Sequence, residues 1–202
     1  MLKIYHTPPS RSVRVVWLAE ELGVPYESVA TPFGGPAPAG FIEASPLGQL
    51  PAIDDDGVCM VESVAIMQYL LAKRGPSPLE VTKTEKDFAP YLQFLEFGEA
   101  GLAAIGNAYV ATRFRAPEEH KQNWTVDYVV EAIRKRFTLV DARLNDGRQF
   151  IAADRFTAAD ISVGWAIAIM LYFGILESLP PATQAYYERV TSRPAYKKAS
   201  GT

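Results

Sequence analysis

The stretch that decides the fold of this protein is Leu2 to Thr31, "LKIYHTPPSRSVRVVWLAEELGVPYESVAT". It opens with a short apolar strand pattern, continues with a helical pattern that closes on Gly23, and resumes as a second strand pattern. A helix between two strands predicts a parallel β-α-β crossover, because parallel neighbours need a long connection. The chain therefore begins as an α/β domain.

The α/β pattern continues as far as Gly75. Residues 50–53 and 57–60 are short extended runs, and the Asp56-Gly57 pair between them is a strong turn signal. A helical pattern follows and stops at Gly75. The segment between the second and third strands is rich in proline, glycine and alanine, so we expect an irregular loop there.

The strand pattern disappears after the breaker cluster "GPSP" at residues 75–78. At 202 residues the chain exceeds the commonest size of a single domain, which favours two packed units. We predict residues 1–75 as the first domain, residues 76–84 as a linker and residues 85–202 as an all-α domain. The predicted helices of the second domain cover residues 84–114, 117–144, 157–173 and 183–192.

A helix-start signal lies in the second domain at "FTAADI". Thr157 is followed three residues later by Asp160, which is the pattern of a capping box with a short carboxylate. Phe156 and Ile161 occupy the positions of a hydrophobic staple around it. The apolar segment 161–176 is too short to span a membrane, so the signal predicts a buried core helix.

The first long helix of this domain carries unusual glycines. Gly98, Gly101 and Gly106 each cost roughly 1 kcal/mol of helix propensity against alanine, which a kink or a close neighbouring backbone would explain. That neighbour could belong to a twin subunit or to the same chain. An aromatic series at spacing three on the same helix is interpreted as core rather than pocket: Phe88, Tyr91, Phe94 and Phe97.

The composition argues against several classes of protein. A net charge of −3 and a pI near 5.5 provide no basic field for non-specific nucleic-acid binding. Cys59 is the single cysteine, so an internal disulfide is excluded, and we interpret it as a buried structural thiol. The N-terminus lacks a secretory signal, so we expect a cytoplasmic location. His6 and His120 have no ligand-spaced neighbours, so no metal site is expected.

Four motifs, in this order and spacing, resemble the cytosolic glutathione transferases across nearly the whole chain. They are "TPPSRSVRVVWLAEELGVPYE", "SPLGQLPAI", "ESVAIMQYL" and the structural match "FTAADI". The resemblance implies a thioredoxin-like glutathione-binding domain, an all-α C-terminal domain, glutathione as co-substrate and a homodimer. The usual Asn-Pro-x-Gly of this family reads Ser45-Pro46-Leu47-Gly48 here.

The motif "GQLPAI" contains a proline at a strand start. The resemblance implies a cis bond before Pro51, which would turn the backbone of Leu50 outward to pair with glutathione as an added strand would. Without the resemblance, a plain strand-opening proline explains the pattern. Gln49 stands where lysine is common, and its amide can still bind the glycyl carboxylate as a neutral partner.

Glu62 and Ser63 stand directly before a helical pattern. Ser63 has the place of an N-cap, and capping alone would explain it. The resemblance implies a second role, in which Glu62 pairs with the γ-glutamyl ammonium group. The Ser63 hydroxyl and the amides at the helix N-terminus would then receive the neighbouring carboxylate.

The hydroxyls at the first strand-to-helix junction suit an anion. A thiol has a pKa of about 8.5 and reacts as the thiolate, so glutathione needs help to ionise. One hydrogen bond to a charged group contributes about 1.5–3 kcal/mol, enough to lower that pKa by roughly one to two units. Ser10 is our first candidate donor and Ser12 the second, with Thr7 and Tyr5 behind them, and Arg11 could add positive charge. Both serines could instead be helix caps only.

The resemblance predicts conjugation of the glutathione thiolate to a small electrophilic, largely apolar substrate. It also suggests Tyr109, Arg113 and Phe114 as substrate-binding residues. Glutathione-dependent reduction, isomerisation or ether cleavage is a second interpretation, although a hydroxyl rather than a thiol at the junction argues against disulfide exchange. A non-catalytic glutathione-binding domain is a third.

Overall fold

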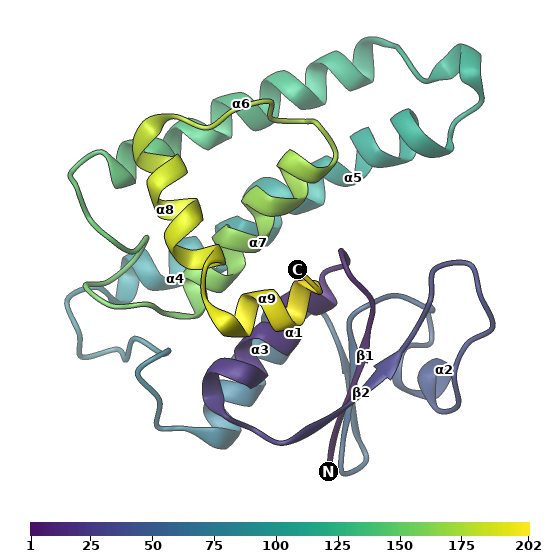
Figure 1. The fold of residues 1–202 in the computed structure, drawn as a ribbon, viewed down its shortest axis with the longest axis vertical. Helices are drawn as coiled ribbons and strands as arrows, with labels where there is room; N and C mark the ends of the chain where they lie inside the picture. The colour runs from purple at the N-terminus through teal and green to yellow at the C-terminus, as the bar shows by residue number, and fades with distance from the viewer. The chain divides into compact units, whose positions relative to one another are not determined.

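The chain forms two compact units in a computed structural model that describes residues 1–202 (Figure 1). The first unit contains Met1–Glu80 together with Thr191–Thr202, and the second contains Val81–Val190. The expected α/β domain followed by an all-α domain is confirmed. The C-terminal residues, which the sequence pattern placed in the helical domain, belong by their contacts to the first unit.

A four-stranded sheet organises the first unit, in the order β2-β1-β3-β4. Strand β1 pairs parallel with β2 and antiparallel with β3, so the predicted β-α-β crossover is confirmed. β3 and β4 form an antiparallel hairpin. The strands are β1 Leu2–His6, β2 Tyr26–Ala30, β3 Ala52–Asp55 and β4 Val58–Val61.

Helices cover this sheet, and α1 is the most deeply buried of them. It ends where predicted, because Gly23 adopts φ 64° and donates its N–H to the carbonyls of Ala19 and Glu20. The helices of the unit are α1 Ser12–Leu22, α2 Phe41–Ala44, α3 Ser63–Arg74 and α9 Pro194–Ser200.

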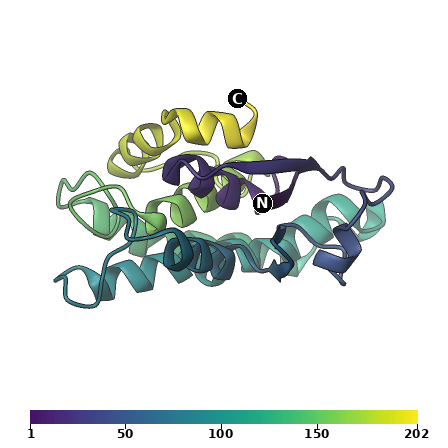
Figure 2. The same cartoon turned by 90° about the horizontal axis from the view of Figure 1, so that it is seen from below.

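Helix α9 reaches α1 from the far end of the chain, and the two lie side by side (Figure 2). The Trp17 and Tyr196 rings meet edge to face with centroids 4.8 Å apart. Two ion pairs extend the contact, Arg193 with Glu21 and Lys198 with Glu20, each at 2.6 Å. The sequence pattern did not predict α9, because its short length leaves almost no periodicity to read.

The second unit is entirely helical. The predicted helix at residues 84–114 consists of α-helical and π-helical segments, and the predicted core helix is buried on nearly every side as α7. No helix of the chain is long and apolar enough to cross a membrane. The elements are α4 Phe88–Glu96, η1 Phe97–Ala103, α5 Ala104–Val110, η2 Ala111–Arg115, η3 Glu118–His120, α6 Trp124–Leu144, α7 Ala158–Tyr172 and α8 Pro181–Thr191.

The predicted capping box at the start of α7 is confirmed and is larger than a local cap. Asp160 is fully buried, and its carboxylate accepts the backbone N–H of Thr157 and of Ile151, both at 2.8 Å. The Thr157 hydroxyl donates to it at 3.1 Å and the Tyr186 hydroxyl of α8 at 3.2 Å. One carboxylate therefore joins α7 to the preceding loop and to α8.

The low helix propensity of Gly98 led us to expect a close neighbouring backbone. That neighbour is present and belongs to the same chain. A Cβ atom on Gly98 would lie 2.6 Å from the backbone carbonyl carbon and oxygen of Ser162 in α7. Ser162 also donates its hydroxyl to the carbonyl of Leu95 at 2.7 Å. The π-helical segment and α7 thus touch backbone to backbone.

We expect Gly98→Ala to lower the free energy of unfolding by about 1–3 kcal/mol, because the added methyl group must push two backbones apart. Gly106→Ala is the matched control, since a Cβ there meets the flexible end of the Met170 side chain. Urea unfolding followed by circular dichroism measures both variants. Equal stability of Gly98→Ala and the wild type would contradict this packing.

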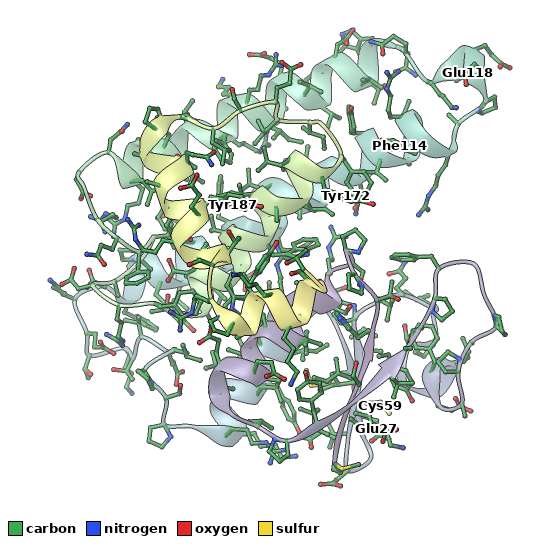
Figure 3. All side chains as sticks on the ribbon, in the orientation of Figure 1. Glu27, Cys59, Phe114, Glu118, Tyr172 and Tyr187 are labelled. Atoms are coloured by element: carbon green, nitrogen blue, oxygen red, sulfur yellow. The ribbon has the colours of Figure 1, made fainter.

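Cys59 corrects one expectation. We predicted a buried thiol, but the side chain is exposed (labelled in Figure 3). It lies in β4, the edge strand of the sheet, where side chains have fewer neighbours than on the central strands.

Candidate functional site

The turn between β1 and α1 holds the two candidate serines in one hydrogen-bonded network. Ser10 Oγ and Ser12 Oγ lie 2.6 Å apart, and the Ser12 backbone N–H donates to Ser10 Oγ at 3.2 Å. Ser12 Oγ also lies 2.7 Å from His6 Nδ1 and accepts the backbone N–H of Thr7 at 3.2 Å. The hydroxyls are therefore coupled to each other and to a histidine.

Burial separates the two serines. Ser10 is partly exposed, whereas Ser12 is completely buried behind it as the first residue of α1. Arg11, also partly exposed, occupies the N-cap position. Tyr5 is a core residue, with its ring 5.3 Å from that of Phe41. Of the predicted group, Ser10, Arg11 and Thr7 are partly exposed at this turn, whereas Ser12 and Tyr5 are buried.

The turn before β3 is ordered by a buried serine. Ser45 Oγ donates to the backbone carbonyl of Gln49 at 2.8 Å and accepts its N–H at 2.9 Å, which explains how serine can stand where the family usually has asparagine. The Leu50–Pro51 peptide bond is cis, as the resemblance implied. Leu50 lies outside the strand ladders, and the turn leaves its backbone N–H and C=O unused. The Gln49 side chain is exposed.

The start of α3 differs in detail from the prediction. We predicted Ser63 as the N-cap, but the N-cap is Glu62 and Ser63 is the first helical residue. Glu62 is exposed and adopts φ 71°, a conformation that is rare outside glycine and tends to occur at functional sites. Ser63 is buried, and its hydroxyl accepts Nη1 of Arg14 at 3.2 Å. Arg14 thus orients a candidate binding residue.

The strand register brings these three segments together. Ala52 of β3 pairs with Tyr5 on one side and with Val61 on the other, so the three residues form a row across the sheet. The next residues along each strand lie at the same edge of the sheet. Beyond this row, the chain continues from His6 into the turn that contains Ser10. On β3 the cis-proline turn comes directly before Ala52, and on β4 Glu62 comes directly after Val61. Residues far apart in sequence therefore form one candidate site.

In the helical unit, Tyr109 and Phe114 belong to an aromatic cluster. Their ring centroids are 6.3 Å apart, and Phe173 lies 5.4 Å from Phe114 and 5.0 Å from Tyr172. Tyr109 is buried, while Phe114 and Tyr172 are more than half exposed (both labelled in Figure 3). Sequence reasoning missed Phe173 and Tyr172, because a pair at a helix end carries no periodic signal.

Arg113 is exposed and donates to Oε1 of Gln122 at 3.1 Å. Its guanidinium is thus directed along the surface of the helical unit. It does not take part in the aromatic cluster of Tyr109 and Phe114.

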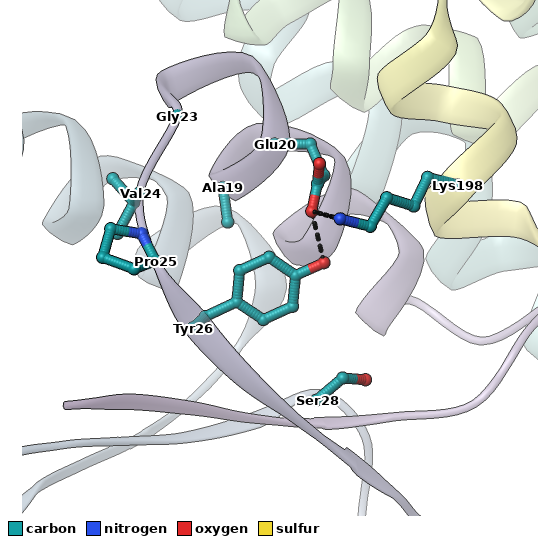
Figure 4. Close-up of a pocket in the computed structure, with 8 residues that line it drawn as sticks. All are labelled: Ala19, Glu20, Gly23, Val24, Pro25, Tyr26, Ser28 and Lys198. Carbon is teal, nitrogen blue, oxygen red and sulfur yellow. Dashed lines mark hydrogen bonds and ion pairs between the residues drawn. The ribbon is translucent and has the colours of Figure 1, made fainter.

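A separate pocket of about 480 Å³ lies between the end of α1, the start of β2 and α9 (Figure 4). Glu20 accepts the Tyr26 hydroxyl at 2.6 Å and pairs with Lys198 at 2.6 Å inside it. Burial raises the pKa of Glu20, but these two hydrogen bonds outweigh it and hold the pKa below its ordinary value. The charges of this pocket satisfy one another, and none of the predicted site residues lines it.

The fold and the site define a class: a thioredoxin-like domain with a cis-proline turn and a polar helix start, joined to a helical domain. The sequence matches two parts of one family, the glutathione S-transferase N-terminal domain over residues 1–72 and its C-terminal domain over residues 105–198. The chain is 32% identical over 170 residues to glutathione S-transferase 3 of Schizosaccharomyces pombe, covering 79% of this chain and 70% of that protein. The protein belongs to the glutathione S-transferase family.

Solved structures of glutathione transferases have a similar fold. A glutathione transferase from Methylococcus capsulatus superposes with a TM-score of 0.85 at 25% identity, covering 100% of this chain and 98% of that one. A glutathione transferase from Pseudomonas putida, solved with one glutathione disulfide bound per subunit, superposes with a TM-score of 0.84 at 24% identity, covering 98% of this chain and 90% of that one.

Proposed function

We propose that this protein conjugates the thiolate of glutathione to a small electrophilic, largely apolar substrate. The observation that carries the proposal is the row of paired residues that places the Ser10 turn, the cis-proline turn and Glu62 at one edge of the sheet. The glutathione disulfide bound to the Pseudomonas putida relative supports the choice of ligand.

The tripeptide would be held at both ends. At the γ-glutamyl end, the exposed Glu62 carboxylate pairs with the ammonium group, and Ser63 with the amides at the start of α3 receives the carboxylate. In the middle, the unused backbone groups of Leu50 beside Pro51 pair with the peptide as an added strand would. The Gln49 amide binds the glycyl carboxylate as a neutral partner.

Ser10 is the residue proposed to contact the sulfur. Of the two hydrogen-bonded serines in the turn, Ser10 is partly exposed and Ser12 is buried. Ser10 also lies beside Arg11 at the beginning of α1. An O–H donor and the positive end of the helix dipole both favour a thiolate there. Ser12 supports Ser10 from behind and does not contact the ligand.

The apolar substrate is proposed to contact Tyr109 and Phe114. The exposed Phe114 ring offers a surface for an aryl or alkyl group, and the buried Tyr109 ring packs against it. Arg113 remains a proposed substrate contact through its exposed guanidinium. From the resemblance we also propose a cytoplasmic homodimer. Conjugation is preferred to disulfide exchange because the turn carries hydroxyls, and the single cysteine lies on β4.

Calorimetric titration with glutathione tests the binding site. We expect Glu62→Gln to weaken binding by about tenfold or more, since a hydrogen bond to a charged group contributes about 1.5–3 kcal/mol and 1.4 kcal/mol is tenfold. Glu27→Gln is the matched control, because Glu27 is exposed on β2 (labelled in Figure 3) and takes no part in the site.

The reaction is tested with an activated aryl halide and with a small disulfide as alternative substrates. Turnover of the aryl halide supports conjugation, and turnover of the disulfide alone supports reduction. Glutathione binding equal in the wild type and Glu62→Gln would contradict the proposed grip on the γ-glutamyl group. No binding to the wild type would contradict the whole proposal.

A further inference from the structure

A hydrogen-bonded chain leads from the candidate sulfur site into the protein and ends on helix α9. It runs from Ser10 Oγ to Ser12 Oγ at 2.6 Å, and from Ser12 Oγ to His6 Nδ1 at 2.7 Å. The His6 ring also has a hydrogen bond to the backbone of Ala199. Every member of this chain belongs to the first unit.

We propose that His6 receives the proton of the glutathione thiol through Ser12 and Ser10. This inference rests on the proposed function, in which the sulfur lies beside Ser10. His6 does not touch the sulfur itself. It is a positioning residue that determines the direction of the hydroxyl hydrogens in the chain.

The backbone of Ala199 selects the tautomer of His6. Nδ1 faces Ser12, so we assign the Ala199 bond to the other ring nitrogen, Nε2. A carbonyl oxygen only accepts, so Nε2 carries a hydrogen atom. In a neutral ring the other nitrogen, Nδ1, is then an acceptor. The Ser12 hydroxyl therefore donates to Nδ1 at 2.7 Å rather than to its other acceptor, the Thr7 carbonyl, which lies farther away at 3.4 Å.

The direction of the Ser12 hydrogen bond also determines the direction of the Ser10 hydrogen bond. With its own hydrogen on Nδ1, the Ser12 oxygen accepts the Thr7 N–H and the Ser10 hydroxyl. Ser10 in turn accepts the Ser12 N–H, which leaves one lone pair for a ligand. In the resting state Ser10 thus presents an acceptor to its exposed side, which suits a protonated thiol and not a thiolate.

Proton transfer reverses the chain in a balanced way. The S–H bond of glutathione breaks and its proton goes to Ser10, the Ser10 hydrogen goes to Ser12, and the Ser12 hydrogen goes to Nδ1 of His6. One proton has moved from sulfur to imidazole, and no electron has been gained or lost by the pair. The Ser10 hydroxyl now donates to the thiolate, and both nitrogens of His6 donate, to Ser12 and Ala199.

The electrostatic surroundings keep the His6 ring unprotonated before glutathione binds, so that Nδ1 has a lone pair available. Burial lowers the pKa of His6, and the Ala199 hydrogen bond opposes this only in part, so the ring is neutral at pH 7. No charged side chain contributes to this shift. The charged groups on β1 and on the elements packed against it are Lys3, Arg11, Arg14, Glu20, Glu21, Glu27, Asp54, Asp55, Arg193, Lys197 and Lys198.

Several of these charged groups have other partners. Arg193 and Lys198 of α9 pair with the two glutamates of α1, and these same pairs hold Ala199 in place against the ring. Arg14 donates to Ser63. The C-terminal helix therefore does more than cover α1, because it supplies the carbonyl that orients the relay.

His6→Asn in the full-length protein tests the relay. An asparagine can place an oxygen near Ser12 to accept its hydroxyl, but it cannot take up a proton. The ultraviolet absorbance of the thiolate of bound glutathione, followed against pH, gives the midpoint of ionisation. We expect that midpoint to rise by about one to two pH units toward the ordinary thiol value of about 8.5. We also expect kcat at pH 7 to fall about tenfold or more, with little change in KM for glutathione.

Two further variants make the result decisive. His120→Asn is the matched control, because His120 is exposed in the helical unit, and it should leave the midpoint unchanged. Ser12→Ala interrupts the same hydrogen-bonded relay without changing His6, so it should raise the midpoint of thiol ionisation as His6→Asn does. It also provides a test of the relay if His6→Asn does not fold. The double variant should show no further rise.

The outcomes separate this inference from the proposed function. A midpoint raised by Ser10→Ala but unchanged in His6→Asn and Ser12→Ala would overturn the relay and leave the conjugation proposal standing. Absence of glutathione binding, or an unchanged midpoint in Ser10→Ala, would overturn the proposed function and the relay with it. A raised midpoint in His6→Asn and Ser12→Ala, together with wild-type glutathione affinity, supports both.

Discussion

Asp160→Ala is expected to lower the free energy of unfolding by about 3–5 kcal/mol, the range typical when a buried, hydrogen-bonded charge network loses one partner. The carboxylate accepts four hydrogen bonds in a fully buried position. Its removal leaves two backbone N–H groups and two hydroxyls without their acceptor, and each unsatisfied buried group costs about 1–3 kcal/mol. The loss extends beyond a normal N-cap, because the start of α7, the loop at Ile151 and Tyr186 of α8 all depend on the same side chain.

Urea unfolding followed by circular dichroism measures this loss. Asp154→Ala is the matched control, because Asp154 is highly exposed and forms a surface ion pair with Lys86 at 3.3 Å, so a change of about 0–1 kcal/mol is expected. A stability loss of the same size in both variants would contradict the role assigned to the Asp160 network.

The stability difference between the wild type and Asp160→Ala should also depend on pH. Burial raises the pKa of Asp160 to about 6, against an ordinary value of 3.8, although its hydrogen bonds favour the charged form. A carboxyl whose folded pKa is raised binds its proton more tightly in the folded state, so its contribution to stability falls as pH rises through this window. The difference should therefore be larger near pH 4 than at pH 7. A difference that grows with pH would contradict the raised pKa.

Ser10→Ala is expected to reduce kcat/KM for conjugation about tenfold to a hundredfold at pH 7, with little change in glutathione affinity. The lost hydrogen bond to the thiolate contributes about 1.5–3 kcal/mol, and each 1.36 kcal/mol on the barrier is tenfold in rate. Affinity is preserved because the tripeptide is held by other residues, at Glu62, Ser63 and the Leu50 backbone. The loss should shrink at high pH, where the thiol ionises without help.

Steady-state kinetics against pH and calorimetric titration with glutathione measure the two effects separately. Ser28→Ala is the matched control, because Ser28 is an exposed serine on β2 that lines the separate pocket (Figure 4). Full activity of Ser10→Ala at pH 7 would exclude Ser10 as the thiolate donor.

Several elements of the fold could be predicted because their signals are local. The alternation and the helical period between Leu2 and Thr31 required a parallel crossover, and the structure contains it. Gly23 closes α1 in the left-handed conformation that glycine favours, and the box of Thr157 and Asp160 opens α7. Each of these signals involves residues within a few positions of one another, where backbone geometry and hydrogen bonding follow from the residue types.

The predictions that failed concern burial and exact position. Cysteine is a residue type that is often buried, but Cys59 lies on β4, which is an edge strand, and its side chain is exposed. Strand order depends on pairing between distant segments, so the local sequence did not reveal this exposure. Ser63 has a capping side chain, but the tight connection from β4 moved the cap to Glu62. Helix α9 and its contacts with α1 gave no periodic signal, because a helix this short is stabilised by what it packs against.

By itself, the sequence determined the α/β beginning, the helical second half and the residue types offered to a ligand, since these follow from local pattern and side-chain chemistry. Only the tertiary structure decided which of them meet. The register of Tyr5, Ala52 and Val61 aligned the three motifs at one edge, burial placed Ser12 behind Ser10, and the return of α9 brought the backbone of Ala199 to His6. Such contacts join residues far apart in the chain, and packing of whole elements, which no local window contains, determines them.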